Sequence, residues 1–261
     1  MTNRFSIITI CFNNLADLQT TIASVDMQAL KPYEHIIING STKPDIEEWL
    51  STNPQPGYRM VVNEKDKGIA DAFNKGIHRA KGDIILLLNS GDELAQPDTL
   101  QVVNDLFVKN PNITWLHGKY WFKRGGIWVV LGKPYERSKL YRGMRSICHQ
   151  TMYVKKLVYE KYGDFTLEFP ICMDYDYLVR MRDEPFVFTE TLLARFAPGG
   201  ISMQRSKQIL KENYLIYKKY IGFSIWQWLW NIRLYTLITL MNSPFGKILY
   251  RLKVKLGLEN M

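Results

Sequence analysis

A polar loop that carries a carboxylate follows a wholly apolar run near the middle of the chain. Residues 84–88 read Ile-Ile-Leu-Leu-Leu, and Asn89-Ser90-Gly91-Asp92 comes next. The apolar run predicts a buried strand, and ligands bind at the carboxyl ends of strands in an open parallel sheet. Divalent cations that carry nucleotide diphosphates typically use only one or two protein carboxylates, so Asp92 is a candidate ligand for Mg²⁺ or Mn²⁺. The alternative is an ordinary turn, in which Gly and Asp are common.

A second pair of carboxylates, Asp174 and Asp176, lies where the sequence predicts the start of a helix. Residues two apart cannot share one helical face, so only one of them is well placed to act on a ligand. Asp174 can also be the N-cap of this helix. The two roles are compatible, because a capping carboxylate is held rigidly.

A third group of polar residues lies on the helix predicted after Gly68. Asp71, Asn74 and Lys75 have the spacing i, i+3, i+4 and share one face, so they can point together toward a ligand at the helix start. Free N–H groups and the positive end of the helix dipole suit a diphosphate there. An Asp near a helix start is also a common cap, which is the alternative for Asp71.

Strands and helices are predicted to alternate along the first 204 residues. Short apolar runs predict strands at 5–11, 35–38, 58–62, 84–88 and 113–117. Helices are predicted at 15–27, 44–51, after Gly68, and at 97–109. Two aromatic runs around Gly125-Gly126 predict a hairpin at 120–131. This order predicts one α/β domain from residue 1 to about 204, with a mostly parallel sheet.

Residues 68–94, GIADAFNKGIHRAKGDIILLLNSGDEL, closely resemble the corresponding segment of family 2 glycosyltransferases. These are inverting, nucleotide-sugar-dependent enzymes of GT-A fold, and the resemblance spans about Phe5 to Met203. Their strand commonly ends in an Asp-x-Asp-Asp-like run whose last Asp binds the divalent metal, and Asp92 occupies that place. Asn89 and Gly91 stand where many members carry acids, which leaves Asp92 as the one clear carboxylate ligand.

The resemblance implies a donor site for a nucleoside diphosphate sugar. Its residues would be Thr9, Phe12, Asn39, Asp66, Gly68, Asp71 and Asn74. Asp66 would contact the base or ribose, and Asp71 with Asn74 would lie nearer the sugar. Members usually carry Asp where this chain has Asn39, and that Asp accepts from a uracil- or thymine-type base, which favours a UDP- or dTDP-sugar. An amide can donate as well as accept. The alternative for Thr9 and Phe12 is a core strand leading into a helix cap.

The same resemblance implies the catalytic and acceptor residues. The first aspartate of the family's Glu-Asp-x-Asp-like motif is the catalytic base, which corresponds to Asp174, and Met173 replaces the usual Glu. His149 and Gln150 correspond to positions near the acceptor, and Asp176 is a further acceptor-site candidate. A lone His is also commonly structural.

The net charge of +9 is concentrated at the carboxyl end of the chain. Residues 205–261 hold ten Lys and Arg against two Glu, a net +8. A basic segment favours an anionic partner, either nucleic acid or a phospholipid leaflet. Residues 221–242 are apolar and rich in Trp, but Gln227, Asn231 and Arg233 are costly at the centre of a bilayer. We therefore expect a helical extension, residues 205–261, that lies in the headgroup region. Packing on the body or on a partner subunit is the alternative.

Cysteine usage and the amino terminus predict a cytoplasmic protein. The three cysteines are odd in number and widely spaced, and no signal-peptide pattern precedes the first strand. Together with the basic extension, this predicts a peripheral enzyme at the inner face of the cell membrane. Its expected acceptor is a lipid-linked glycan in surface polysaccharide assembly, of which lipopolysaccharide is one kind.

Two other function classes fit less well. A nucleotidyltransferase usually has a Gly-rich, basic phosphate loop after its first strand, which CFNNLADLQ lacks. A nucleic-acid-binding protein would need basic residues interleaved with exposed aromatic residues along a groove. We therefore expect no nucleic-acid partner.

Overall fold

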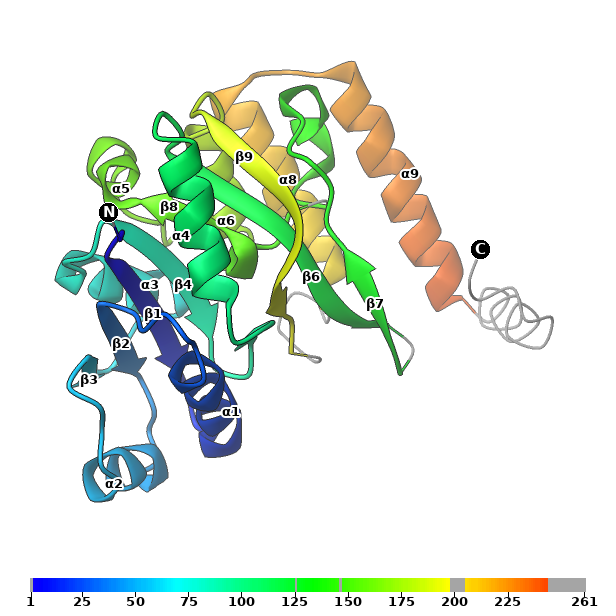
Figure 1. Ribbon diagram of the computed structural model, residues 1–261. Coiled ribbons are helices and arrows are strands. Elements are labelled where there is room, and N and C mark those ends of the chain that lie inside the picture. Colours follow the sequence, from blue (N-terminus) through cyan, green and yellow to red (C-terminus); the bar gives the residue numbers. More distant parts are fainter. Residues whose placement is uncertain (1, 125, 146, 198–204, 244–261) are drawn as a thin grey trace.

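A mixed sheet runs through the centre of the protein and carries helices on both faces (Figure 1). The computed structural model describes residues 2–124, 126–145, 147–197 and 205–243. The strands are β1 (Phe5–Cys11), β2 (Glu34–Asn39), β3 (Arg59–Asn63), β4 (Ile84–Asn89), β5 (Glu93–Leu94), β6 (Trp115–Arg124), β7 (Ile127–Leu131), β8 (Tyr153–Lys155) and β9 (Phe186–Arg195). The helices are α1 (Leu15–Asp26), α2 (Asp45–Thr52), α3 (Ile69–Arg79), α4 (Thr99–Lys109), α5 (Lys156–Tyr162), α6 (Met173–Arg180), α8 (Ser206–Tyr220) and α9 (Ile225–Asn242), with short 3-10 turns η1 (Arg137–Arg142) and η2 (His149–Thr151).

The neighbouring strands β3, β2, β1 and β4 are all parallel. In their register Cys11 pairs with Asn39, Asn39 pairs with Asn63, and Ile10 pairs with Asn89. β1 and β2 are buried along their whole length, as expected for strands covered on both faces. The carboxyl ends of the four strands therefore meet at one edge of the sheet, where ligands bind in such folds.

The other half of the sheet is mixed, so the parallel arrangement expected for most of the sheet holds for only half of its pairings. β8 lies between β4 and β6 and is antiparallel to both, β7 is antiparallel to β6, and β5 is antiparallel to β9. Only β6 and β9 are parallel in this half. The hairpin expected at 120–131 is present, but its first strand reaches back to Trp115 and absorbs most of the separate strand expected at 113–117.

Alternating side chains of β1 divide the core between two helical layers. Ile8 packs with Phe73 of α3, on the face that α5, α6 and α8 also cover. Ile7 packs on the opposite face with Leu100 of α4. α3 approaches the sheet closely at Gly76, where an added Cβ would lie 2.3 Å from Ile8 Cγ2. This close packing holds α3, and the loop at its start, firmly over the ends of the strands.

Helix α8 is part of the core, although the sequence assigned it to the basic extension. Ile216 is fully buried in the cluster that includes α3 and α6. Glu212 is buried as well, and its Oε2 accepts the N–H groups of Ile171 (3.1 Å) and Cys172 (2.8 Å). The first N–H groups of a helix lack partners within it, so Glu212 satisfies the start of α6.

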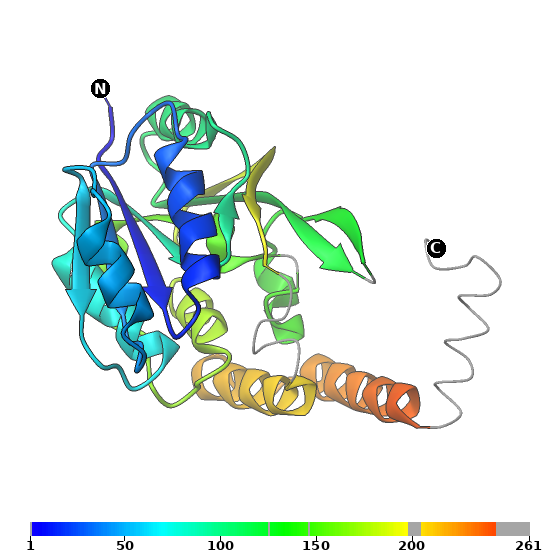
Figure 2. The ribbon, with the colours of Figure 1, turned by 90° about the horizontal axis from the view of Figure 1, so that it is seen from below.

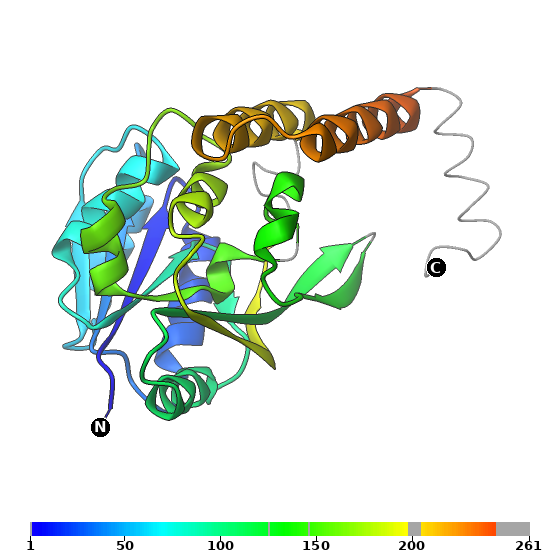
Figure 3. The same cartoon turned by 90° about the horizontal axis from the view of Figure 1, so that it is seen from above.

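Helix α9 extends away from the sheet beyond α8, as Figures 2 and 3 show. It contacts α8 and η1. Its exposed apolar side chains are Ile225, Trp226, Trp228, Leu229, Ile232, Tyr235, Leu237 and Leu240. None of the described helices has the length and hydropathy needed to span a bilayer. The part of the expected extension after residue 243 lies outside the described residues. The division of the chain at residue 204 stays a prediction.

Replacement of Glu212 by Ala is expected to lower the free energy of unfolding by about 1–3 kcal/mol, because two backbone N–H groups lose their acceptor. Urea denaturation measures this change. Glu160→Ala is the matched control, since Glu160 is an exposed helical glutamate on α5. Equal stabilities of the two variants would show that Glu212 does not hold the start of α6.

Candidate functional site

Asp92 lies on the loop after β4 and is almost fully buried, with 2% of its surface exposed. Its carboxylate accepts three N–H groups from three separate segments. Asn89 Nδ2 lies 3.2 Å and Gln150 Nε2 lies 2.7 Å from Oδ2, and the backbone N of Ala197 lies 2.7 Å from Oδ1. Burial raises the pKa of the Asp92 carboxyl above its ordinary value, while the three donors act in the opposite direction.

Two other oxygen atoms at the carboxyl end of β4 are buried without a hydrogen-bond partner among the described residues. They are Asn89 Oδ1 and Ser90 Oγ. Such atoms are uncommon in folded proteins and call for an explanation. In the described part of the chain, no group of three or more His, Cys, Asp and Glu side chains is arranged to hold a metal ion.

A chain of polar contacts connects Asp92 to Asp174. Asn89 Nδ2, which donates to Asp92, also lies 3.1 Å from His149 Nε2. His149 Nδ1 in turn lies 3.6 Å from Asp174 Oδ2. Asn89 Nδ2 can donate to His149 Nε2, and the other ring nitrogen of His149 faces Asp174. The structure thus brings together residues expected separately for the metal, the acceptor and catalysis.

Asp174 lies in the first turn of α6. Cys172 is the N-cap and makes no side-chain capping bond, so the expectation that Asp174 caps this helix is wrong. The Asp174 side chain is 29% exposed. Its Oδ1 accepts the N–H of Tyr175 at 2.7 Å. Its other oxygen is therefore available to a ligand.

Asp176 is fully buried, unlike Asp174. Its Oδ2 accepts from Arg180 Nε at 2.9 Å, one helical turn away. The two carboxylates face different surroundings, as their spacing predicted. Asp176 lies in the core beside Arg180 and not with the other candidate residues, while Gln150 lies directly against Asp92.

Asn39 and Asn63 face each other at the ends of β2 and β3. Asn39 Nδ2 donates to Asn63 Oδ1 at 2.9 Å, and Asn39 Oδ1 accepts the N–H of Ser41 at 3.1 Å. Phe12, on the loop after β1, is 62% exposed. Thr9 is fully buried, and its hydroxyl lies 2.9 Å from His35 Nε2. This environment agrees with the alternative that Thr9 belongs to a core strand.

Asp66 and Gly68 form the loop before α3. Asp66 Oδ1 accepts the N–H of Gly68 at 2.8 Å. Gly68 is the N-cap of α3 with φ of 117°, a conformation that favours glycine. Asp66 also lies against Gly40, where an added Cβ would be 1.8 Å from Asp66 Oδ2. Gly40 therefore leaves the space that Asp66 needs at the carboxyl end of β2.

Asp71 lies in the first turn of α3, where its Oδ2 accepts the backbone N–H of Lys67 at 2.9 Å. Lys75 Nζ lies 3.4 Å from the same oxygen. The hydrogen bond from Lys67 is the main cause that lowers the pKa of the Asp71 carboxyl. The shared face of Asp71 and Lys75 is thus present, with the two side chains paired.

Asn74 is buried and turned away from the loop. Its Nδ2 donates to the carbonyl of Phe165 at 2.9 Å, and its Oδ1 accepts the N–H of Phe165 at 2.9 Å. Both functions of the amide are therefore used to join α3 to the segment before α6. A donor contact by Asn74 stays a prediction.

Two residues of this region were not expected from the sequence. Asn63 follows the third strand as Asn39 follows the second, and this equivalent position is a signal that could have identified it. Ala197 contributes only its backbone N–H, which no side-chain pattern reveals.

Residues 6–163 match the family model described as glycosyl transferase family 2. The chain belongs to this family. It is a transferase of the sugar-transferring class, and the nucleotidyltransferase alternative is therefore wrong. The chain is 33% identical over 205 residues to an uncharacterized glycosyltransferase of Mycobacterium tuberculosis, with 77% of each chain covered. It is 24% identical over 218 residues to a PGL/p-HBAD biosynthesis glycosyltransferase of Mycobacterium bovis, which covers 76% of this chain and 78% of that one.

Solved structures confirm the expected GT-A fold. A mannosyltransferase from Pyrobaculum calidifontis, in complex with GDP-Man and Mn²⁺, aligns with a TM-score of 0.62 at 13% identity, over 100% of this chain and 82% of that one. TarS of S. aureus (residues 1–349), in complex with UDP-GlcNAc, aligns with a TM-score of 0.59 at 12% identity, over 86% and 69% of the two chains.

Asp66 is a predicted contact of the donor nucleotide. Replacement of Gly40 by Ala is therefore expected to displace Asp66 and to weaken binding of a nucleoside diphosphate. Loss of one charge-assisted hydrogen bond raises Kd by about tenfold to hundredfold. Isothermal titration calorimetry measures this change. Gly57→Ala is the control, because nothing lies within 4 Å of a Cβ added there. Unchanged affinity in Gly40→Ala would remove Asp66 from the donor site.

Proposed function

We propose that this glycosyltransferase moves a sugar from a nucleoside diphosphate sugar to a hydroxyl of a lipid-linked glycan acceptor, with inversion at the anomeric carbon. The observation that carries the proposal is the contact chain from Asp92 through Asn89 and His149 to Asp174. It joins the loop at the end of a parallel strand to a partly exposed carboxylate on α6. One end suits the diphosphate and the other suits the attacking hydroxyl.

Asp174 is the proposed general base. As the acceptor oxygen forms its bond to the anomeric carbon, the bond to the diphosphate oxygen breaks and the hydroxyl proton passes to the Asp174 carboxylate. Attack from the face opposite the leaving group in one displacement inverts the configuration. The N–H of Tyr175 fixes Asp174 Oδ1, and His149 Nδ1 lies 3.6 Å from Oδ2.

Replacement of Asp174 by Asn is expected to lower the rate of sugar transfer by about 10²–10⁴-fold, because the amide cannot take the proton. Donor binding should be retained, since the amide preserves the shape of the side chain. Transfer is measured with radiolabelled nucleotide sugar, and Asp164→Asn, at an exposed aspartate, is the control. Turnover near the wild-type rate would assign the base elsewhere.

The oxygen atoms after β4 fit a divalent cation, Mg²⁺ or Mn²⁺. Asp92 would supply a carboxylate and Asn89 Oδ1, buried without a donor, would supply a carbonyl oxygen; hard cations prefer such ligands. The donor diphosphate would provide further ligands. When bound, the cation stabilises negative charge on the leaving diphosphate. The solved relative with GDP-Man and Mn²⁺ supports this assignment.

The donor nucleotide is proposed to be of the UDP or dTDP type. Asn39 is buried between Asn63 and Ser41 at the end of β2, and Phe12 is exposed on the neighbouring loop. An exposed aromatic ring beside amide groups suits a nucleobase, which offers a face for stacking and an edge for hydrogen bonds. The structure of TarS with UDP-GlcNAc supports this choice. The structure of the mannosyltransferase with GDP-Man makes a GDP-sugar the alternative donor.

Thermal denaturation with nucleoside diphosphates and Mn²⁺ identifies the donor. A specific ligand at a hundredfold excess over its Kd should raise the stability by about 2.7 kcal/mol. Asp92→Asn should remove the dependence of this increase on Mn²⁺ and leave the metal-free increase in place. The proposal fails if no nucleotide stabilises the wild type. An unchanged Mn²⁺ dependence in Asp92→Asn would place the metal elsewhere.

The acceptor is proposed to lie at an anionic membrane surface, with the enzyme peripheral at the cytoplasmic face. α9 exposes eight apolar side chains along one side of the helix, and an apolar patch of this kind marks an interaction site. β7 exposes Ile127 and Val130, and the β6–β7 hairpin extends from the same side of the protein as α9 (Figures 1 and 2). The three tryptophans and Arg233 of α9 favour the headgroup region.

Leu229→Gln is expected to weaken co-sedimentation with anionic liposomes about fivefold, because an exposed apolar side chain of α9 no longer enters the lipid. Leu157→Gln on α5 is the matched control, since this leucine is equally exposed (49% against 46%) on a different helix. Retention on DNA without binding to liposomes would favour the nucleic-acid alternative.

A further inference from the structure

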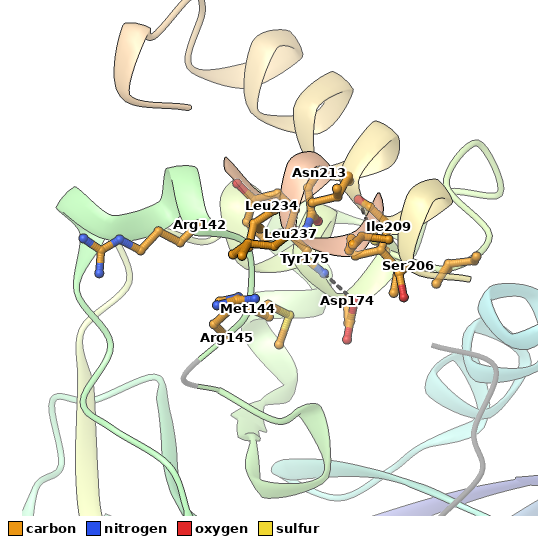
Figure 4. A pocket seen from close by; sticks show the side chains of 14 residues that line it. Arg142, Met144, Arg145, Asp174, Tyr175, Ser206, Ile209, Asn213, Leu234 and Leu237 are labelled. Atoms are coloured by element: carbon orange, nitrogen blue, oxygen red, sulfur yellow. Dashed lines mark hydrogen bonds between the residues drawn. The ribbon is translucent and has the colours of Figure 1, made fainter. Parts of the chain in front are cut away.

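A cavity of about 770 Å³ lies beside Asp174, between the start of α6, η1, α8 and α9 (Figure 4). Its size is that of a small-molecule site. Asp174 is the one acidic residue among the described residues that line it. The wall is otherwise largely apolar, and its apolar members are Met144, Ile171, Ile209, Leu210, Leu234, Leu237 and Ile238. The proposed base therefore faces a space that favours hydrocarbon rather than sugar alone.

Arginine side chains form a basic edge on this cavity. Arg142 and Arg145 line it, and the guanidinium carbon of each lies 5.1 Å from the ring centre of Trp230 on α9. Arg233 approaches the same ring at 5.3 Å. Each guanidinium is attracted to the face of the ring, and the positive charge that gathers beside Trp230 suits an anionic group.

Two further observations indicate that the basic edge is built for an anion. Trp230 Nε1, a hydrogen-bond donor, is buried and has no acceptor among the described residues. Neither Arg142 nor Arg233 forms an ion pair with an acidic side chain in the described part of the chain. Arginine is well suited to phosphate, which it binds through paired N–H groups.

We propose that this cavity binds the acceptor as an amphiphile whose hydrocarbon chain is joined to the glycan through a phosphate or diphosphate. The chain lies along the apolar wall of α8 and α9, the phosphate lies at the Arg142 edge, and the glycan hydroxyl reaches Asp174. This inference rests on the proposed function and specifies the acceptor class. The exposed apolar residues of α9 allow the chain to pass from the membrane into the cavity along one helix.

Calorimetric titration of the full chain with decyl phosphate, decanol and inorganic phosphate tests this inference. Decyl phosphate, kept below its micelle concentration, should bind at least tenfold more tightly than either of the other two. Arg142→Gln should weaken decyl phosphate about tenfold and leave decanol within twofold. Leu237→Gln should weaken both amphiphiles. Leu240→Gln is the matched control, because Leu240 is similarly exposed on α9 and does not line the cavity.

The inference is overturned if decyl phosphate binds no more tightly than decanol, which would indicate an acceptor lipid without phosphate. It is also overturned if Arg142→Gln and Leu237→Gln bind both amphiphiles as Leu240→Gln does. Stabilisation by a nucleoside diphosphate is measured on the same samples. If that stabilisation is present while the cavity fails these tests, the proposed function stands without this acceptor site. If it is absent, the proposed function itself fails.

Discussion

The burial of one carboxylate is the constraint on which the site depends. A charge removed from water is costly unless hydrogen bonds replace its hydration. Asp92 obtains these bonds from the last residue of β4, from η2 and from the segment after β9. Segments that are far apart in the chain must therefore meet at Asp92. The same hydrogen bonds hold Asn89 in position to contact His149. His149 in turn lies beside Asp174 on α6.

The start of α6 has a second support on the opposite side. Glu212 of α8 accepts the N–H groups of Ile171 and Cys172, just before Asp174. The partly exposed carboxylate of Asp174 is thus held between a histidine on one side and a buried glutamate beneath its helix. The helix that carries this glutamate also forms a wall of the cavity beside Asp174. The same helix therefore positions Asp174 and shapes the space that it faces.

Patterns of neighbouring residues in the sequence predicted strand bounds and the faces of helices. The apolar run of β1 gave its bounds at Phe5 and Cys11, and the run of β4 correctly placed Asp92 after a buried strand. The spacing of Asp174 and Asp176 correctly indicated that only one would be accessible. Each of these predictions needed only periodicity and neighbouring residues.

Contacts between distant segments were beyond such patterns. The insertion of β8 between β4 and β6 depends on pairing between distant segments. β8 has only three residues, which are too few to show an alternating pattern of apolar side chains. The amide of Asn74 joins Phe165 across 91 positions, and no local pattern reveals that contact. The charge of α8 hid its role in the core, because lysines on its outer face dominate its composition while Ile216 and Glu212 are buried.

The apolar surface of α9 affects how the purified protein behaves in solution. In aqueous buffer its tryptophans and leucines contact water directly, and large exposed apolar patches promote association. Two copies that met through this helix would cover each other's hydrocarbon surface and so compete with detergent or lipid for it. We therefore expect the apparent molecular mass of a purified sample to depend on protein concentration and on the detergent present.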